Sequence, residues 1–134
     1  MPILSVQDVT VQFGGLKAND NISFDVQAGS IFAVIGPNGA GKTTSFYMIV
    51  GMVKPNSGHI FLDLQDITRE PMYRRAQLGI GYLPQEASVF RKLSVEQNLF
   101  AILELTKLTK TQQHEKAEQL LQEFGLTHVR KNLG

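Results

Sequence analysis

The sequence predicts an α/β protein in three successive parts. Residues 1–30 are expected to form antiparallel β structure, residues 31–90 an α/β core, and residues 91–134 the start of a helical subdomain. Three observations predict this order: apolar and polar residues alternate near the start, a glycine-rich loop joins an apolar run to a helical pattern, and two helix-start signals follow. We expect one domain built around the glycine-rich loop.

Composition fits a folded domain and excludes several classes of site. The chain has 134 residues, of which 43% are hydrophobic and 19% charged, which is typical of a globular protein. A net charge of +1 gives no argument for a nucleic-acid partner. Because there is no cysteine, no disulfide or thiolate metal site is expected. The three histidines lie far apart, so we expect no metal cluster.

The first part has the alternation of strands with one solvent-facing side. Residues 3–13 alternate in two phases, and the change of phase near Gln7 and Asp8 predicts a β-bulge. Gly14 and Gly15 predict a turn, and residues 21–27 alternate again. No stretch approaches the ~18 apolar residues that span a bilayer, and no signal peptide is visible, so any membrane role is expected to come through a partner.

The glycine-rich loop reads GPNGAGKTT and fits the phosphate-binding pattern G-x-x-x-x-G-K-[ST]. Its glycines allow backbone N–H groups to approach phosphate oxygens. Lys42 would place a positive charge on the β and γ phosphates, and the Thr43 hydroxyl would bind Mg²⁺. The predicted nucleotide-binding residues are Gly36, Pro37, Asn38, Gly39, Ala40, Gly41, Lys42, Thr43 and Thr44.

The flanking sequence supports this assignment. The apolar run 30–35 predicts a buried central strand, and residues 44–50 predict a helix that begins at about Lys42 and stops at Gly51. The alternative is an ordinary glycine-rich turn between strand and helix. That alternative explains neither Lys42 nor Thr43.

The middle of the chain adds a turn over 53–58, a strand over 59–63, a short helix over 71–78 and a strand over 79–83. Its arginines, Arg69, Arg74 and Arg75, are predicted to form a solvated face, with an anion contact as the alternative.

Two capping boxes predict two helices in the last part. Ser94 with Gln97 opens the first, and Thr109 with Gln112 opens the second, whose stop signal is Gly125. Their apolar stripes are expected to be core. A short helix over 127–133 is predicted to end the chain.

In this order, the stretches IGPNGAGKTT (35–44) and GIGYLPQ (79–85) resemble ABC-type ATPases, and the match runs from Ile3 to the last residue. The resemblance implies a truncated ABC ATPase fold. Within the family, FYMIVGMVKPNSGHIFLD and GIGYLPQEASVFRKLSVEQNL resemble the ATP-binding subunits that power lipopolysaccharide export. The cofactors it implies are ATP and Mg²⁺.

The resemblance also implies roles for two residues outside the loop. Phe13 takes the place of the aromatic that stacks on adenine, where the family more often has tyrosine; a core phenylalanine is the alternative. Gln85 takes the place of the Q-loop glutamine, which contacts Mg²⁺ and the attacking water; a polar loop residue is the alternative. Lys42 and Gln85 are thus the implied catalytic residues, and Thr43 and Gln85 the implied metal ligands.

The implied partners are transmembrane subunits, docked on the stretch that begins at Glu86 and ends at Leu93, and a second copy of the full-length protein. The alternative for the stretch is that Phe90 and Leu93 close the core. The implied location is the cytoplasmic face of the inner membrane, and no nucleic-acid partner is expected.

The chain departs from the family pattern in two ways. Asn19 and Ser45 stand where the family usually has an apolar and a larger residue. No LSGGQ-like signature, Asp-Glu strand or switch histidine is found, so we expect the N-terminal part of a longer protein that binds nucleotide without turnover by itself. The alternatives are a soluble ABC-type ATPase of translation or DNA repair, and a P-loop GTPase or small-molecule kinase.

Overall fold

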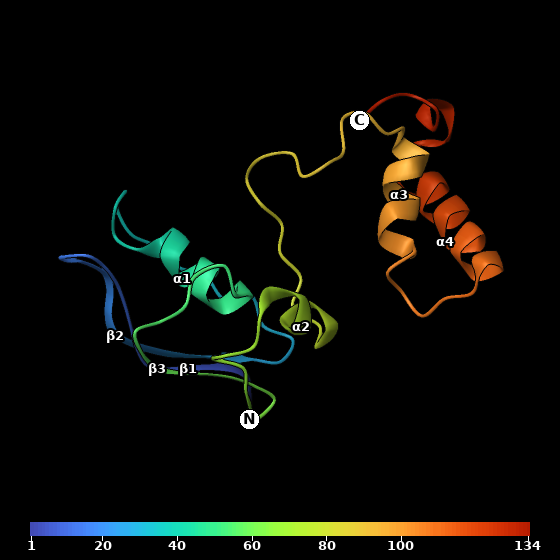
Figure 1. Cartoon of the computed structure of the whole chain (residues 1–134). Coiled ribbons are helices and arrows are strands. Elements are labelled where there is room, and N and C mark those ends of the chain that lie inside the picture. Colours follow the sequence, from blue (N-terminus) through green and yellow to red (C-terminus); the bar gives the residue numbers. More distant parts are fainter. The chain divides into compact units, whose positions relative to one another are not determined.

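The computed structural model describes all 134 residues and divides into two compact units, Met1–Tyr82 and Leu83–Gly134. The first unit holds a sheet and two helices, and the second holds two helices and a short 3₁₀ turn (Figure 1). None of the helices is long and apolar enough to cross a membrane.

The first unit is organised on a four-stranded antiparallel sheet with the order β2-β1-β3-β4. The strands are β1 (Pro2–Phe13), β2 (Leu16–Gln27), β3 (Ser57–Leu62) and β4 (Gln65–Asp66). The predicted antiparallel start and the strand after the turn are therefore confirmed. The predicted bulge is confirmed too: the register of β1 against β2 shifts between Val6 and Val9, and Asp8 has a φ of 50°.

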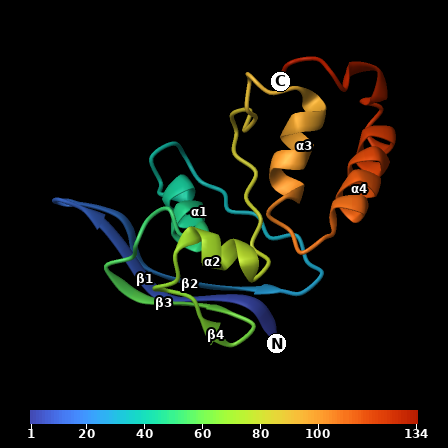
Figure 2. The same cartoon turned by 45° about the vertical axis from the view of Figure 1, so that its right-hand side comes forward.

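The core of this unit lies between the sheet and α1 (Lys42–Val50). Figure 2 shows α1 and α2 (Met72–Gln77) on the same side of the sheet. Val9 and Val11 of β1 lie on the helix side because successive strand residues point to opposite faces, and the bulge between Val6 and Val9 brings Val6 to the same side. The fully buried cluster consists of Val6, Val9, Val11, Met48, Ile60 and Ile67.

α1 begins and ends as the sequence predicts, whereas α2 is one residue shorter at each end than the predicted helix over 71–78. α1 starts at Lys42 and stops at Gly51, whose φ of 94° suits glycine and whose N–H donates to Tyr47 O at 3.1 Å. Pro71 precedes the first residue of α2. The predicted solvated arginine face is wrong for one member, because Arg75 is 2% exposed and binds backbone carbonyls.

The predicted strands over 30–35 and 79–83 are not formed. Neither segment pairs with a strand of the sheet. Ile31 and Ile35 are 101% and 90% exposed, so the predicted buried strand is also not buried. A strand requires a hydrogen-bonded neighbour, and the residues of these runs have none in this chain. Two aromatic residues of these runs do have partners: Phe32 stacks on the Phe24 ring 5.1 Å away, and Tyr82 meets the Tyr47 ring edge-on at 6.5 Å.

The second unit is built on α3 (Val95–Leu103) and α4 (Lys110–Glu123). Both predicted capping boxes are present, since Ser94 and Thr109 each accept from the backbone three residues on. Leu103, Ala117 and Leu121 are buried, so each predicted apolar stripe contributes to the core, but Ile102 and Phe124 of the same stripes are 62% and 66% exposed. The predicted terminal helix is shorter than expected, a 3₁₀ turn over Thr127–Val129.

Candidate functional site

The glycine-rich loop leads directly into α1. Ala40 N donates to Pro37 O at 3.2 Å, which closes a tight turn over residues 37–40. Gly39 is the third residue of this turn and has a φ of 85°, a value that glycine adopts without strain. Every residue from Gly36 to Ala40 is exposed, so the backbone of the loop is open to solvent.

Gly41 lies where no other residue fits. Its φ is 90°, and a Cβ atom added there would lie 2.2 Å from Ala18 O on β2. At Gly41 the backbone of the loop therefore contacts the backbone of β2 directly. This contact fixes the position at which α1 begins, one residue later.

The start of α1 presents donors without a partner. Ser45 N makes the first helical bond, to Gly41 O at 3.0 Å, while the N–H groups of Lys42, Thr43 and Thr44 donate no hydrogen bond within the chain. No acidic side chain lies in the first turn. Free N–H groups and the positive end of the helix dipole favour a bound anion.

The Lys42 ammonium lies over the loop. Nζ donates to Gly36 O and, at 3.3 Å, to Pro37 O. The side chain therefore folds back toward the residues at the start of the loop. The Thr43 hydroxyl is exposed and makes no hydrogen bond within the chain, so it is available to a ligand.

The two residues outside the loop are both exposed. Phe13 ends β1 and is 52% exposed, which disfavours the alternative of a core phenylalanine. Gln85 lies in an irregular segment at the start of the second unit. The loop belongs to the first unit and Gln85 to the second, so their roles remain separate predictions.

In the stretch 86–93, the backbone of Phe90 is held by hydrogen bonds and its side chain is exposed. Asn98 accepts from Phe90 N at 2.8 Å and donates to Phe90 O at 3.1 Å. The Phe90 side chain is nevertheless 59% exposed and Val89 is 48% exposed, while Leu93 is half-buried. Phe90 therefore does not close the core, whereas Leu93 is partly covered.

Two residues next to the loop form a buried contact that the motif did not indicate. Asn19 on β2 donates to Ser45 Oγ at 3.0 Å and to Gly41 O at 3.2 Å. Both residues are more than nine-tenths buried. They are 26 positions apart, so no local pattern connects them. The only sequence signal was that both depart from the family's usual residue types.

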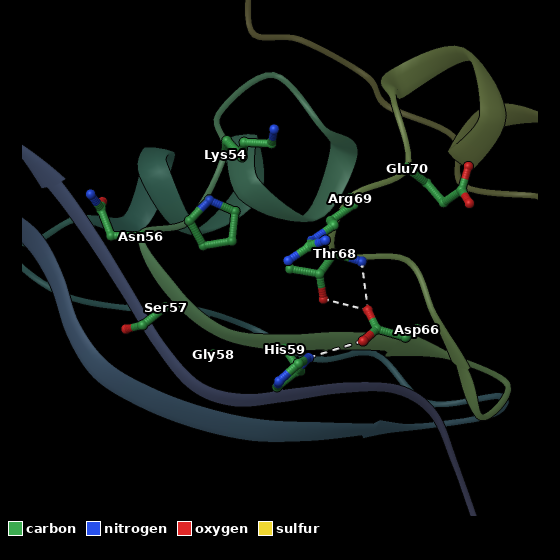
Figure 3. Close-up of a pocket in the computed structure, with 10 residues that line it drawn as sticks. Lys54, Asn56, Ser57, Gly58, His59, Asp66, Thr68, Arg69 and Glu70 are labelled. Atoms are coloured by element: carbon green, nitrogen blue, oxygen red, sulfur yellow. Dashed lines mark hydrogen bonds and ion pairs between the residues drawn. The ribbon is translucent and has the colours of Figure 1, made fainter.

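A separate hollow of about 810 Å³ lies beside β3 (Figure 3). Asp66 is held there by the Thr68 hydroxyl and N–H at 2.5 and 2.9 Å and by His59 Nδ1 at 2.9 Å. The Thr68 hydrogen bonds, followed by His59, lower the pKa of the Asp66 carboxyl. The lining contains no residue of 36–44, and its two carboxylates are already paired, Asp66 with His59 and Glu70 with Arg74, so the loop remains the candidate site.

The part of the chain that holds the loop and the start of α1 also matches a protein-family model. Residues 19–133 match the model described as ABC transporter. The chain belongs to the ABC transporter family. The predicted fold, a P-loop core with an antiparallel β part and the start of a helical part, is that of ABC ATP-binding cassettes.

The curated relatives of this chain are described either as lipopolysaccharide export proteins or more generally as ABC transporter ATP-binding proteins. The lipopolysaccharide export system ATP-binding protein LptB of Haemophilus influenzae is 49% identical over all of this chain and 56% of its own length. LptB of Escherichia coli K12 is 43% identical over the same shares. A probable ABC transporter ATP-binding protein of Azorhizobium caulinodans is 56% identical over 90% of this chain and 43% of its own length. The chain thus spans about half the length of these relatives.

Solved structures give the same family. The structure of MJ1267, an ATP-binding cassette of an ABC transporter, matches with a TM-score of 0.82 and 27% identity. It covers 99% of this family member and 58% of the other chain. A structure of cbiO1 from Clostridium perfringens, part of the transporter complex cbiONQ, matches with a TM-score of 0.81 and 26% identity over 98% and 54% of the two chains.

Proposed function

We propose that this chain is the nucleotide-binding part of an ABC transporter subunit and binds Mg·ATP at residues 36–44. The observation that carries the proposal is the set of unpaired N–H groups of Lys42, Thr43 and Thr44 beside the Lys42 ammonium. Together they provide several donors and one positive charge at a single helix start. A chain of two or three phosphates carries the charge and the acceptor oxygens that match them.

Four residues of the loop have distinct tasks in this proposal. Gly39 and Gly41 hold the left-handed backbone that turns the N–H groups outward. Lys42 exchanges its carbonyl partners for phosphate oxygens. Thr43 offers its free hydroxyl to Mg²⁺, which neutralises phosphate charge when bound. Phe13 is exposed enough to stack on adenine, and Gln85 is proposed to orient the attacking water.

The larger assembly is proposed from the relatives. LptB of H. influenzae and of E. coli are described as ATP-binding proteins of a lipopolysaccharide export system. By likeness to them, we propose that the full-length protein hydrolyses ATP as a homodimer on the cytoplasmic face of the inner membrane and powers lipopolysaccharide export. An ABC-type ATPase unconnected to transport is the second candidate, distinguished by whether membrane subunits co-purify with the full-length protein.

The site is tested by comparing ligands that differ only in phosphates. We expect the chain to bind ADP and ATP in the presence of Mg²⁺ and to bind adenosine at least about 100-fold more weakly, since several charge-assisted hydrogen bonds are lost. Isothermal titration calorimetry measures both affinities. Equal affinity for ADP and adenosine would contradict a phosphate site.

We further propose that residues 86–93 dock a transmembrane subunit. Phe90 is 59% exposed on a backbone that Asn98 holds at both its N–H and its carbonyl. An exposed aromatic on a rigid loop can be buried by a partner without a large ordering cost. Arg91 is exposed next to it, and arginine and aromatics are enriched at interface hot spots.

Phe90→Ala is expected to change stability by less than about 0.5 kcal/mol, because the side chain is largely in solvent, and to weaken assembly with the membrane subunits. Melting curves and co-purification of the full-length variant measure the two effects. Leu105→Ala is the matched control, since Leu105 is 84% exposed but lies outside the stretch. A marked fall in melting temperature with assembly intact would favour a core role for Phe90 instead.

A further inference from the structure

A buried polar cluster connects the sheet to the phosphate-binding loop. The Gly41 carbonyl accepts three hydrogen bonds: from Ser45 N at 3.0 Å, from Ser45 Oγ at 3.0 Å and from Asn19 Nδ2 at 3.2 Å. Asn19 also donates to Ser45 Oγ at 3.0 Å. The two side chains are 6% and 5% exposed. A carbonyl oxygen has two lone pairs, so three donors fully use the hydrogen-bonding capacity of this one.

The cluster carries an energetic cost. The Asn19 Oδ1 atom is buried and has no hydrogen-bond partner. A buried acceptor without a partner is unfavourable. A pair of packed apolar side chains in place of Asn19 and Ser45 would avoid this cost. The observed contacts therefore need a reason other than stability.

That reason is the direction of the loop's donors. Gly41 is the residue before Lys42, and its φ of 90° sets the angle at which α1 leaves the loop. The same carbonyl that Asn19 and Ser45 hold belongs to the peptide unit whose other end is the Lys42 N–H. Fixing the carbonyl fixes that N–H, and through the first turn it fixes the N–H groups of Thr43 and Thr44.

We propose that Asn19 and Ser45 are positioning residues, which orient the phosphate-binding N–H groups of α1 by holding the Gly41 carbonyl. This inference rests on the proposed nucleotide site. The ligand they serve is the phosphate chain of ADP or ATP, and neither side chain touches it. Their contribution is preorganisation: the bound orientation of the peptide is already present before the ligand arrives.

Asn19→Leu is the decisive variant, because a positioning role and a structural role predict opposite results. We expect the melting temperature to stay unchanged or to rise, since the unpaired Oδ1 is removed. We expect the dissociation constant for ADP to rise about fivefold to tenfold, the usual worth of one hydrogen bond. A lower melting temperature with unchanged ADP affinity of the folded protein would overturn the proposal.

Ser45→Ala tests the second contact and remains informative if Asn19→Leu folds poorly. It is expected to weaken ADP binding by a similar factor and to weaken AMP binding less, since AMP carries fewer phosphate oxygens. Because both residues act through one carbonyl, the double variant should lose less than the product of the two single effects. If the loss of ADP affinity in the double variant equals the product of the two single losses, the two residues do not act through the same carbonyl.

Two controls separate this inference from the proposed function. Asp20→Asn changes an exposed neighbour of Asn19 on the same strand and should leave ADP affinity unchanged. If the unaltered chain binds no ADP, the proposed nucleotide site itself fails. If the unaltered chain binds ADP and Asn19→Leu binds it equally well, only the positioning role fails.

Discussion

Replacing Lys42 with alanine is expected to abolish measurable ADP and ATP binding, with a loss of about 100-fold or more. The ammonium is the one positive charge that the loop provides, and its partners in this structure are the carbonyls of Gly36 and Pro37. A phosphate oxygen is a better partner for the ammonium than a neutral carbonyl. The N–H groups at the start of α1 remain in the variant, so any residual binding measures their share.

The measurement is calorimetric titration with Mg·ADP, together with a melting curve. Lys42 is not in the buried cluster, so folding should be little affected. Lys54→Ala is the matched control because Lys54 is an exposed lysine of the same unit that lies outside the loop. Equal affinity of the unaltered chain and Lys42→Ala for ADP would remove the basis for assigning residues 36–44 to phosphate binding.

The features that the sequence predicted correctly depend on neighbours along the chain. The loop pattern, the start of α1 at Lys42 and its stop at Gly51 are set by residues within a few positions of one another. The capping boxes at Ser94 and Thr109 are likewise local, since each side chain reaches only three residues ahead. Local chemistry of this kind is readable without knowledge of the tertiary structure.

The predictions that failed depend on distant partners. The apolar run 30–35 has the composition of a buried strand, but strand formation needs a neighbour, and the sheet contains only β2, β1, β3 and β4. The contact between Asn19 and Ser45 joins residues 26 positions apart. A motif search marks the glycines and Lys42 but gives no information on what supports them from the sheet.

Arg75 is the clearest case of a residue whose role the sequence hides. Three arginines lie within seven positions, and one of them is 2% exposed. Its guanidinium donates to four backbone carbonyls, those of Met48, Ile49, Thr68 and Glu70, at distances of 2.5 to 3.0 Å. Two of the acceptors belong to the last turn of α1, where carbonyls have no partner within the helix. The side chain thus connects the end of α1 to α2 and to the segment before it.

Arg75→Ala is expected to destabilise the first unit by about 3–5 kcal/mol, because it truncates a large buried side chain and removes its hydrogen bonds. Four carbonyls lose their donor, and the space of the largest fully buried side chain is left empty. For a chain of this size, the loss corresponds to a fall in melting temperature of roughly 10 °C or more. Urea denaturation and thermal melting both measure it.

Arg74→Ala provides the matched control. Arg74 lies on the same helix one position earlier, but its contacts are exposed: an ion pair with Glu70 at 3.8 Å and a hydrogen bond to Gln77 Oε1 at 3.0 Å. Exposed pairs contribute little, so this variant should change stability by less than about 0.5 kcal/mol. Similar effects of the two substitutions would show that the buried guanidinium is dispensable. A much larger effect of Arg75→Ala would establish that the end of α1 is held by a side chain from α2.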